Sequence, residues 1–135
     1  MRKIKVTAQQ RANAIEARDV LWPSVPPENV AEDLGYWRKG RGKSAPTCGT
    51  VACFGGWVAR WPSFVAQGVK ELGNGCPVMG DGDPWPSTVS LRLFGFPWLF
   101  DTRGFFPADK GFPGTDHELV THRLNWLIRN SVVVR

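Results

Sequence analysis

The run from Cys48 to Trp57, CGTVACFGGW, constrains the fold of this chain more than any other stretch. From Thr50 to Arg60 nearly every residue is apolar or small, which predicts a helix that is buried on most of its sides. Pro62 ends this helix, because proline is not tolerated in a helix interior. Glycine inside a helix costs about 1 kcal/mol relative to alanine. Gly55 and Gly56 therefore predict that a backbone or a large ring packs closely against this helix.

Two capping boxes predict the starts of two further helices. In the pattern S/T-x-x-E/Q, the first and last side chains each accept a hydrogen bond from a free backbone N–H at the helix start. Thr7–Gln10 fits this pattern and predicts a helix over 8–21 that Pro23 ends. Thr115–Glu118 also fits, and it predicts a helix to about Arg129. Helical spacing predicts that one face of the first helix is buried, formed by Ala8, Ala12, Ile15 and Trp22.

The segment between the central run and the last helix is less regular. Ser63 starts a short predicted helix over 63–72, and residues 73–86 form a predicted loop. Ser87 starts another helix, which Gly95 ends as a C-terminal cap. The valines of 131–134 favour an extended tail or a short edge strand.

These elements predict a mainly α fold. A chain of 135 residues is expected to form one domain, over 1–135, and to bury roughly two-thirds of its unfolded surface. Seven Trp and eight Phe indicate a core built largely from aromatic rings. We expect four to six short helices around the central buried helix, long ordered loops and minor β structure. Residues 1–6 are expected to be a flexible start, and 38–46 a mobile basic loop.

The sequence also bears on the compartment. The residues after Met1–Val6 are polar, so no secretory apolar segment follows the start. No apolar run approaches the length of a membrane span. Three cysteines cannot all pair with one another, which favours reduced thiols. We expect a cytoplasmic protein with no membrane partner, and the sequence leaves the oligomeric state open.

A basic segment directly before the central run suggests a ligand site. The free N–H groups at a helix N-terminus attract anions, and the cations upstream can close over a phosphate. The predicted ligand-binding residues are Trp37, Arg38, Lys39, Arg41, Lys43, Cys48, Gly49 and Thr50. The alternative is that Thr50 or Cys48 only caps the helix while the basic segment is solvated.

Cysteine chemistry is a second, competing interpretation. Cys48 is the better nucleophile of the central run, because a helix N-terminus lowers a thiol pKa. A cysteine hydrolase would need His117 or His122 as its base. Cys53 lies within an apolar helix and is typical of a small core residue. No metal and no cofactor are predicted.

The aromatic residues of the loops are further candidates. Trp or Phe rings that are exposed beside cations stack on nucleic-acid bases. Besides Trp37, the candidates are Trp85, Phe105 and Phe106. The same rings could equally form a protein-binding patch.

The central run resembles a family of small uncharacterised proteins of bacteriophages and prophage-bearing bacteria, which carry a C-G-T-x-x-C-x-x-G-W box. Weaker similarities are Leu34–Trp37 before the box, LFG at 93–95, LFD at 99–101 and the closing helix over 115–128. The resemblance covers about 28–129. It departs in the long basic insert after Trp37 and in the Phe/Pro-rich loop at 104–113. It implies a viral or mobile-element origin and no particular reaction.

Together, these features predict a small non-enzymatic binding protein of phage type. The net charge of +5 is consistent with an anionic ligand, either a nucleotide or nucleic acid. Such a protein would sequester or block that ligand or a host factor, for instance as an inhibitor of host defence. The alternatives are a protein-protein interaction module that uses the Phe/Trp-rich loops, and a cysteine-dependent enzyme.

Overall fold

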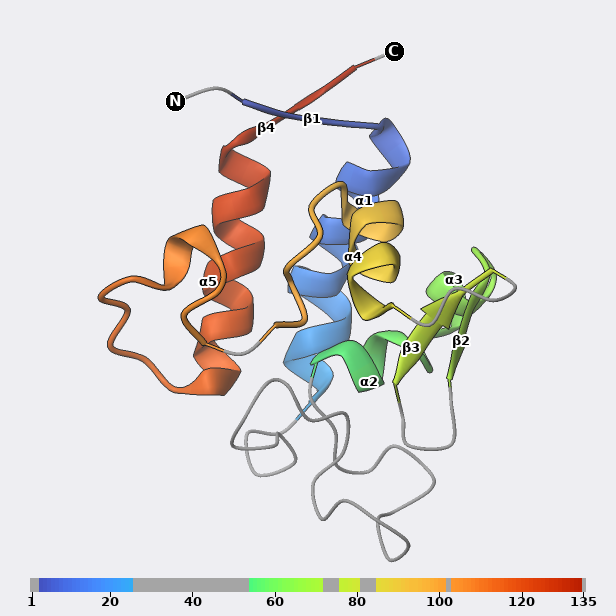
Figure 1. Cartoon of the computed structure of the whole chain (residues 1–135), viewed down its shortest axis with the longest axis horizontal. Helices are drawn as coiled ribbons and strands as arrows, with labels where there is room; N and C mark the ends of the chain where they lie inside the picture. Colours follow the sequence, from blue (N-terminus) through green and yellow to red (C-terminus); the bar gives the residue numbers. More distant parts are fainter. Residues whose placement is uncertain (1–2, 26–53, 72–75, 81–84, 102, 135) are drawn as a thin grey trace, which may run out of the picture.

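A computed structural model describes residues 3–25, 54–71, 76–80, 85–101 and 103–134. Its α-helices are α1 Ala8–Glu16, α2 Phe54–Val58, α3 Pro62–Val65, α4 Pro86–Phe94 and α5 Asp116–Arg129. Its strands are β1 Ile4–Val6, β2 Val69–Glu71, β3 Pro77–Met79 and β4 Ser131–Val133. The prediction of a single small, mainly α domain with minor β structure is confirmed (Figure 1).

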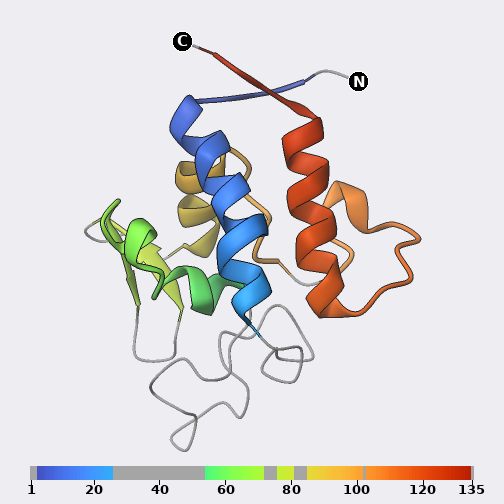
Figure 2. The same cartoon turned by 180° about the vertical axis from the view of Figure 1, so that it is seen from behind.

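Helix α1 is the long central element of the described chain. A π-helical segment, Ala17–Leu21, and a 3₁₀ turn, Trp22–Ser24, continue it. It runs alongside α5 and also packs on α4 (Figures 1 and 2). The antiparallel pair β2–β3 lies beside α4 on the side away from α5. The parallel pair β1–β4 crosses one end of the molecule, next to both chain ends.

The first capping box forms as predicted, but the buried face of the helix is different. The Gln10 backbone N–H donates to Thr7 Oγ1 at 3.0 Å, and the Thr7 N–H donates to Gln10 Oε1 at 2.9 Å. The buried residues are Asn13, Ala14, Ala17, Leu21 and Trp22. Ala8 and Ala12 are exposed, so the predicted face is wrong for them. The prediction chose apolar residues for the buried face, whereas polar Asn13 occupies it, because Gln67 and the Leu93 oxygen satisfy its side-chain amide.

Helix α5 agrees more closely with its prediction. Thr115 and Glu118 form the second capping box. Helical spacing along this helix predicts that Val120, Leu124, Leu127 and Ile128 point inward; the first three are buried, and Ile128 is partly buried. Because a capping box marks its start, this helix is the element that the sequence predicts best.

Helix α2, the described part of the central run, contributes to an aromatic core. The ring of Phe54 lies 5.4 Å from Trp22, 5.5 Å from Phe100 and 6.0 Å from Phe94, centroid to centroid. Phe64 of α3 meets Phe94 edge to face at 5.6 Å. The prediction of a core built largely from aromatic rings is therefore only partly correct: the rings form a connected cluster, but most of the buried core residues are Leu, Val and Ala. The helix itself is shorter than predicted at its C-terminal end, since residues 59–60 form a turn.

The predicted helix over 63–72 is wrong. Helix α3 ends at Val65, and β2 follows after a turn. Its register pairs Val69 with Met79 and Glu71 with Pro77, so part of the predicted loop over 73–86 is strand β3. This pairing is set by contacts distant in sequence, which helical spacing does not reveal.

The expectation of a flexible start at residues 1–6 is corrected for Ile4–Val6. These residues form β1, and its first backbone N–H, that of Ile4, donates to the Asn130 oxygen at 2.7 Å. The side chain of Val6 is buried. A strand of three residues becomes ordered here because β4 supplies its hydrogen-bond partners. The predicted mobile loop at 38–46 lies outside the described residues.

Gly95 is required where α4 ends. Its φ is +84°, a left-handed conformation, and its N–H donates to the Leu91 oxygen at 2.8 Å. The predicted glycine cap is therefore confirmed. A Cβ placed on Gly95 would lie only 2.5 Å from Val6 Cγ1. The glycine thus serves both the turn and the close approach of α4 to β1.

We expect Gly95→Ala to lower the free energy of unfolding by at least about 2 kcal/mol, because it combines left-handed strain with overpacking. Gly111→Ala is the matched control. Gly111 has a φ of +75°, and a Cβ placed on it would meet nothing within 4 Å, so strain alone should cost about 1 kcal/mol. Urea unfolding of both variants measures the difference. Equal costs would contradict the contact with Val6.

Candidate functional site

An open cleft of about 500 Å³ lies between the β2–β3 hairpin and the C-terminal half of α4. Its polar side chains are Gln67, Lys70 and Arg92, and the buried side chains of Met79 and Leu93 lie beneath them. Gly68 and Gly80 complete the lining at the open end of the hairpin, where Val69 pairs with Met79. The cleft therefore brings two cations together over a buried apolar floor.

Both cations that border the cleft are exposed. Successive side chains of a strand point to opposite faces, so Lys70 is exposed on the face opposite the buried Val69 and its partner Met79. On α4, Arg92 is exposed while Leu93 beside it is buried. A Cβ on Gly80 would lie 3.9 Å from Arg92 Nη1, so this guanidinium lies against the end of β3.

The backbone that carries Arg92 is anchored to α1. Gln10 Nε2 donates to the backbone oxygens of Leu91, at 3.2 Å, and Arg92, at 3.3 Å. Asn13 Nδ2 donates to the Leu93 oxygen at 2.8 Å. The Arg92 and Leu93 oxygens belong to the last turn of α4, where no later N–H of the helix is available to them, whereas the Leu91 oxygen also accepts from the Gly95 N–H. Helix α1 satisfies them and thereby fixes the wall of the cleft.

Gln67 is a structural part of the cleft. Its Nε2 donates to Asn13 Oδ1 at 3.0 Å and to the Ser63 oxygen at 3.1 Å. Its Oε1 accepts from Asn13 Nδ2 at 2.9 Å. Both amide hydrogens are thus in use, so a ligand would find its donors in Lys70 and Arg92. Within the described residues, neither cation forms an ion pair with a carboxylate.

This arrangement suits an anion. A guanidinium offers a planar fork of donors that matches a phosphate or carboxylate, and an ammonium adds a compact positive charge.

The ligand-binding residues predicted from the sequence lie outside the described residues, as does Cys53. These predicted residues are Trp37, Arg38, Lys39, Arg41, Lys43, Cys48, Gly49 and Thr50. Their role in binding stays a prediction.

The cleft residues were missed because they carry no local signal. Lys70 falls in a segment predicted as helix, and Arg92 is one cation on an amphipathic helix. Only the pairing of β2 with β3 brings the two together, 22 positions apart in the chain.

Both histidines stabilise the fold. His117 Nε2 donates to the Val25 oxygen at 2.7 Å, and its ring stacks on Trp22. His122 Nε2 donates to the Ala108 oxygen at 2.9 Å, and its ring stacks on Phe112. The two imidazoles thus bind different segments. Among the described residues, no group of three or more His, Cys, Asp or Glu side chains could hold a metal ion.

Cys76, the described cysteine, is buried, and its Sγ lies 3.6 Å from the Pro77 oxygen. Burial raises the pKa of this thiol to about 11. The thiol is therefore protonated at neutral pH and is a poor nucleophile.

The loop aromatics divide into exposed and buried rings. Phe105 is 68% exposed and Trp85 is 66% exposed, so both remain candidates for an interaction. Phe106 is only 2% exposed, and its ring packs on Phe96 and Trp126. The prediction of Phe106 as a contact residue is therefore wrong, because its ring is part of the buried core.

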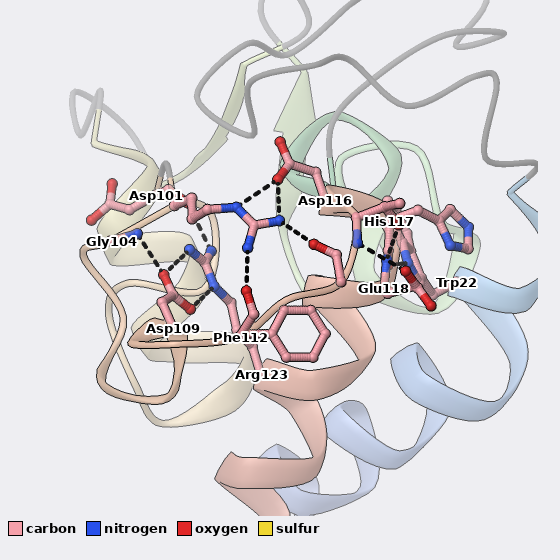
Figure 3. A network of polar contacts seen from close by, with 12 residues as sticks. Trp22, Asp101, Gly104, Asp109, Phe112, Asp116, His117, Glu118 and Arg123 are labelled. Carbon is pink, nitrogen blue, oxygen red and sulfur yellow. Dashed lines mark hydrogen bonds and ion pairs between the residues drawn. The ribbon is translucent and has the colours of Figure 1, made fainter.

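A buried ion pair holds this loop against α5 (Figure 3). Arg123 donates from Nε to Asp109 Oδ1 at 2.9 Å and from Nη2 to Oδ2 at 2.7 Å. Its Nη1 donates to the backbone oxygens of Leu99, at 3.1 Å, and Asp101, at 2.7 Å. The side chains are 0% and 1% exposed. Perturbed buried charges often mark functional sites, but these groups are enclosed and satisfied by protein, so their role is structural.

The electrostatics of the pair follow from these contacts. Burial opposes the charge of Asp109, but the hydrogen bonds from Arg123 and from the backbone N–H groups of Gly104 and Phe106 outweigh it. The net result is a pKa of Asp109 below its ordinary value. Burial raises the pKa of Asp101, against the attraction of Arg123.

No known protein-family model, no curated protein and no solved structure matches this chain. The resemblance to the phage family therefore stays a prediction. None of the helices in the described part of the chain has the length and apolarity that a membrane crossing requires.

We expect Asp109→Asn to lower the free energy of unfolding by about 3–5 kcal/mol at neutral pH, because it leaves the Arg123 charge buried without a counter-charge. The pKa of Asp109 is lowered on folding. The contribution of Asp109 to the free energy of unfolding is therefore present above the unfolded pKa of about 3.9 and is lost as pH falls through the folded pKa. Urea unfolding from pH 7 to pH 2 should show this loss in the wild type and not in the variant.

Asp116→Asn is the control for that experiment. It breaks the ion pair between Arg103 and Asp116, whose side chains are more accessible to solvent. Its cost should not exceed about 1 kcal/mol. A similar cost for both variants would mean that the buried pair does not stabilise the loop more than a surface pair.

Proposed function

We propose that this protein is a small non-enzymatic binding protein that sequesters an anionic ligand, and that the ligand contacts Lys70 and Arg92. The supporting observation is that both cations line one cleft and have no carboxylate partner among the described residues. Cations that face a common hollow favour an anion more than scattered surface charges do.

A nucleotide fits this cleft in chemical terms. Arg92 would bind a phosphate through two donors, and Lys70 would neutralise further negative charge. Met79 and Leu93 are 7% and 1% exposed and offer a base or sugar little surface, so the phosphate contacts would carry the affinity. The basic residues of 38–43 are a second expected source of phosphate contacts.

The biological setting of the proposal comes from the resemblance of the Cys48–Trp57 box to phage proteins. A phage protein in the cytosol of its host could inhibit a defence system by holding a signalling nucleotide. Sequestration needs no turnover: a binder lowers the free ligand concentration in proportion to its own amount and affinity.

Binding can be measured by titration calorimetry with a panel of linear and cyclic nucleotides and with inorganic phosphate. We expect the double variant Lys70→Gln/Arg92→Gln to weaken the binding of its ligand at least about tenfold, because hydrogen bonds to charged groups are lost. The control Lys110→Gln/Arg129→Gln removes the same charges from exposed positions outside the cleft, and it should bind nearly as the wild type does.

A third variant separates the cleft from the basic segment. In this variant, Lys39, Arg41 and Lys43 are changed to Ala. If it loses binding while the Lys70/Arg92 variant binds normally, the ligand uses the basic segment, and the assignment of the ligand to the cleft is wrong. No binding of any anion would contradict the whole proposal. Nucleic acid as the ligand would show a steep loss of affinity with rising salt.

The same titrations test the non-enzymatic part of the proposal. The ligand should be recovered unchanged after long incubation with the protein. Conversion that disappears in Cys48→Ser would favour the cysteine-dependent enzyme instead.

A protein-binding module is the second candidate function, and exposed aromatic rings favour it. Phe105 and Trp98 are 68% and 45% exposed. Trp98 meets Phe96 edge to face at 5.4 Å, and Phe96 in turn contacts Phe106 and Trp126. Aromatic rings at a rigid surface are typical anchors of protein interfaces.

We expect Phe105→Ser to abolish capture of a host factor from lysate, if the protein acts in this way, without lowering its stability by more than about 1 kcal/mol. Phe106 must be kept, because its ring is buried. Val65→Ser is a suitable control, since Val65 is an exposed apolar residue on α3. Unchanged capture by Phe105→Ser would exclude this loop as the contact surface.

A further inference from the structure

Strand β4 pairs with β1 along one edge only. The Ile4 N–H donates to the Asn130 oxygen at 2.7 Å, and the Val134 N–H donates to the Val6 oxygen at 2.9 Å. In a parallel pair, alternate residues of a strand direct their backbone groups toward the partner strand. Ser131 and Val133 therefore direct their N–H and C=O groups away from β1. The sheet has two strands, and within the described residues no third strand pairs with β4.

The two edges of this small sheet differ in chemistry. Lys5 stands on β1 and is exposed, and Lys3, just before the strand, donates from Nζ to the Arg129 oxygen at 2.7 Å. Lysine on an edge strand prevents pairing with another chain. Residues 131–134, Ser-Val-Val-Val, contain no charge and no proline. Val132, Val133 and Val134 are 45%, 41% and 40% exposed. The edge of β4 is thus unprotected and rich in residues that favour strands.

We propose that β4 pairs with β4 of a second copy of this chain, antiparallel about a two-fold axis centred on Val132. In that register Ser131 lies opposite Val133 of the second copy, and each exchanges both backbone hydrogen bonds with the other. All four outward backbone groups of each strand are then satisfied. The result is a four-stranded sheet in the order β1–β4–β4–β1.

A second copy suits this edge better than an unrelated charged segment. Two-fold pairing brings together two edges that carry no charge over 131–134 and leaves β1, with Lys5, at the outside of the sheet. A contact that uses the same patch on both subunits closes after two copies. The contact also stabilises the β1–β4 pair, because a sheet of two three-residue strands is only marginally stable on its own.

This inference is independent of the ligand proposal. The β1–β4 pair lies at the end of the molecule beside the chain termini, whereas the cleft lies between the β2–β3 hairpin and α4 (Figures 1 and 2). Loss of dimerisation should leave anion binding unchanged, and the Lys70 and Arg92 variants should still dimerise.

Sedimentation equilibrium over a range of protein concentrations tests the proposal. The wild type should show a reversible monomer–dimer equilibrium. Val132→Lys and Val132→Glu should each weaken the dimer at least about tenfold, because like charges would lie directly opposite each other at the axis. An equimolar mixture of the two variants should restore a mixed dimer. Val65→Lys, on α3, should dimerise as the wild type does.

Each outcome decides the question. Val132 is 45% exposed, so circular dichroism should show both variants folded. A wild type that stays monomeric up to about 1 mM, well above the Kd of any specific dimer of use to the protein, overturns the proposal. So does a dimer that Val132→Lys leaves intact. A mixture that fails to dimerise rules out the two-fold register centred on Val132.

Discussion

The buried pair of Arg123 and Asp109 is the interaction on which much of this fold depends. Arg123 stands in the middle of α5 and binds three groups at once: the Asp109 carboxylate, the Leu99 oxygen and the Asp101 oxygen. The long 101–114 segment has little regular structure, so its backbone groups need partners from elsewhere. Arg123 satisfies the Asp101 oxygen, and the Asp109 carboxylate that it holds accepts from the Gly104 and Phe106 N–H groups, which keeps this segment packed on α5.

A second buried polar group connects the other half of the molecule. Asn13 is 1% exposed and bonds to Gln9, Gln67 and the Leu93 oxygen. It therefore joins α1 to the turn after α3 and to the end of α4. Lys70 and Arg92 lie on the elements that meet around this point. The fold thus uses its buried polar groups for structure and leaves two exposed cations facing an open hollow, which is the basis of the proposed function.

The sequence predicts the parts of the fold that local chemistry determines. The two capping boxes, the glycine at 95 and the inward face of α5 are each set by residues within one or two helical turns. The β2–β3 hairpin was missed because its register depends on pairing across the chain. The burial of Asn13 and Arg123 was missed for the same reason: a polar residue is buried only where distant partners satisfy it. The candidate cleft depends on the hairpin and on Asn13, so no local motif could identify Lys70 and Arg92.

The central claim is that Arg92 and Lys70 bind the ligand while Arg123 serves the fold. The most direct test is to record the arginine Nε–Hε and lysine side-chain NMR signals of the labelled protein as the bound nucleotide or phosphate is added. We expect the Arg92 and Lys70 signals to shift in a saturable manner, and the signal of buried Arg123 to stay in place and exchange slowly with solvent. Saturable shifts confined to other cations, with Arg92 and Lys70 unchanged, would contradict the account.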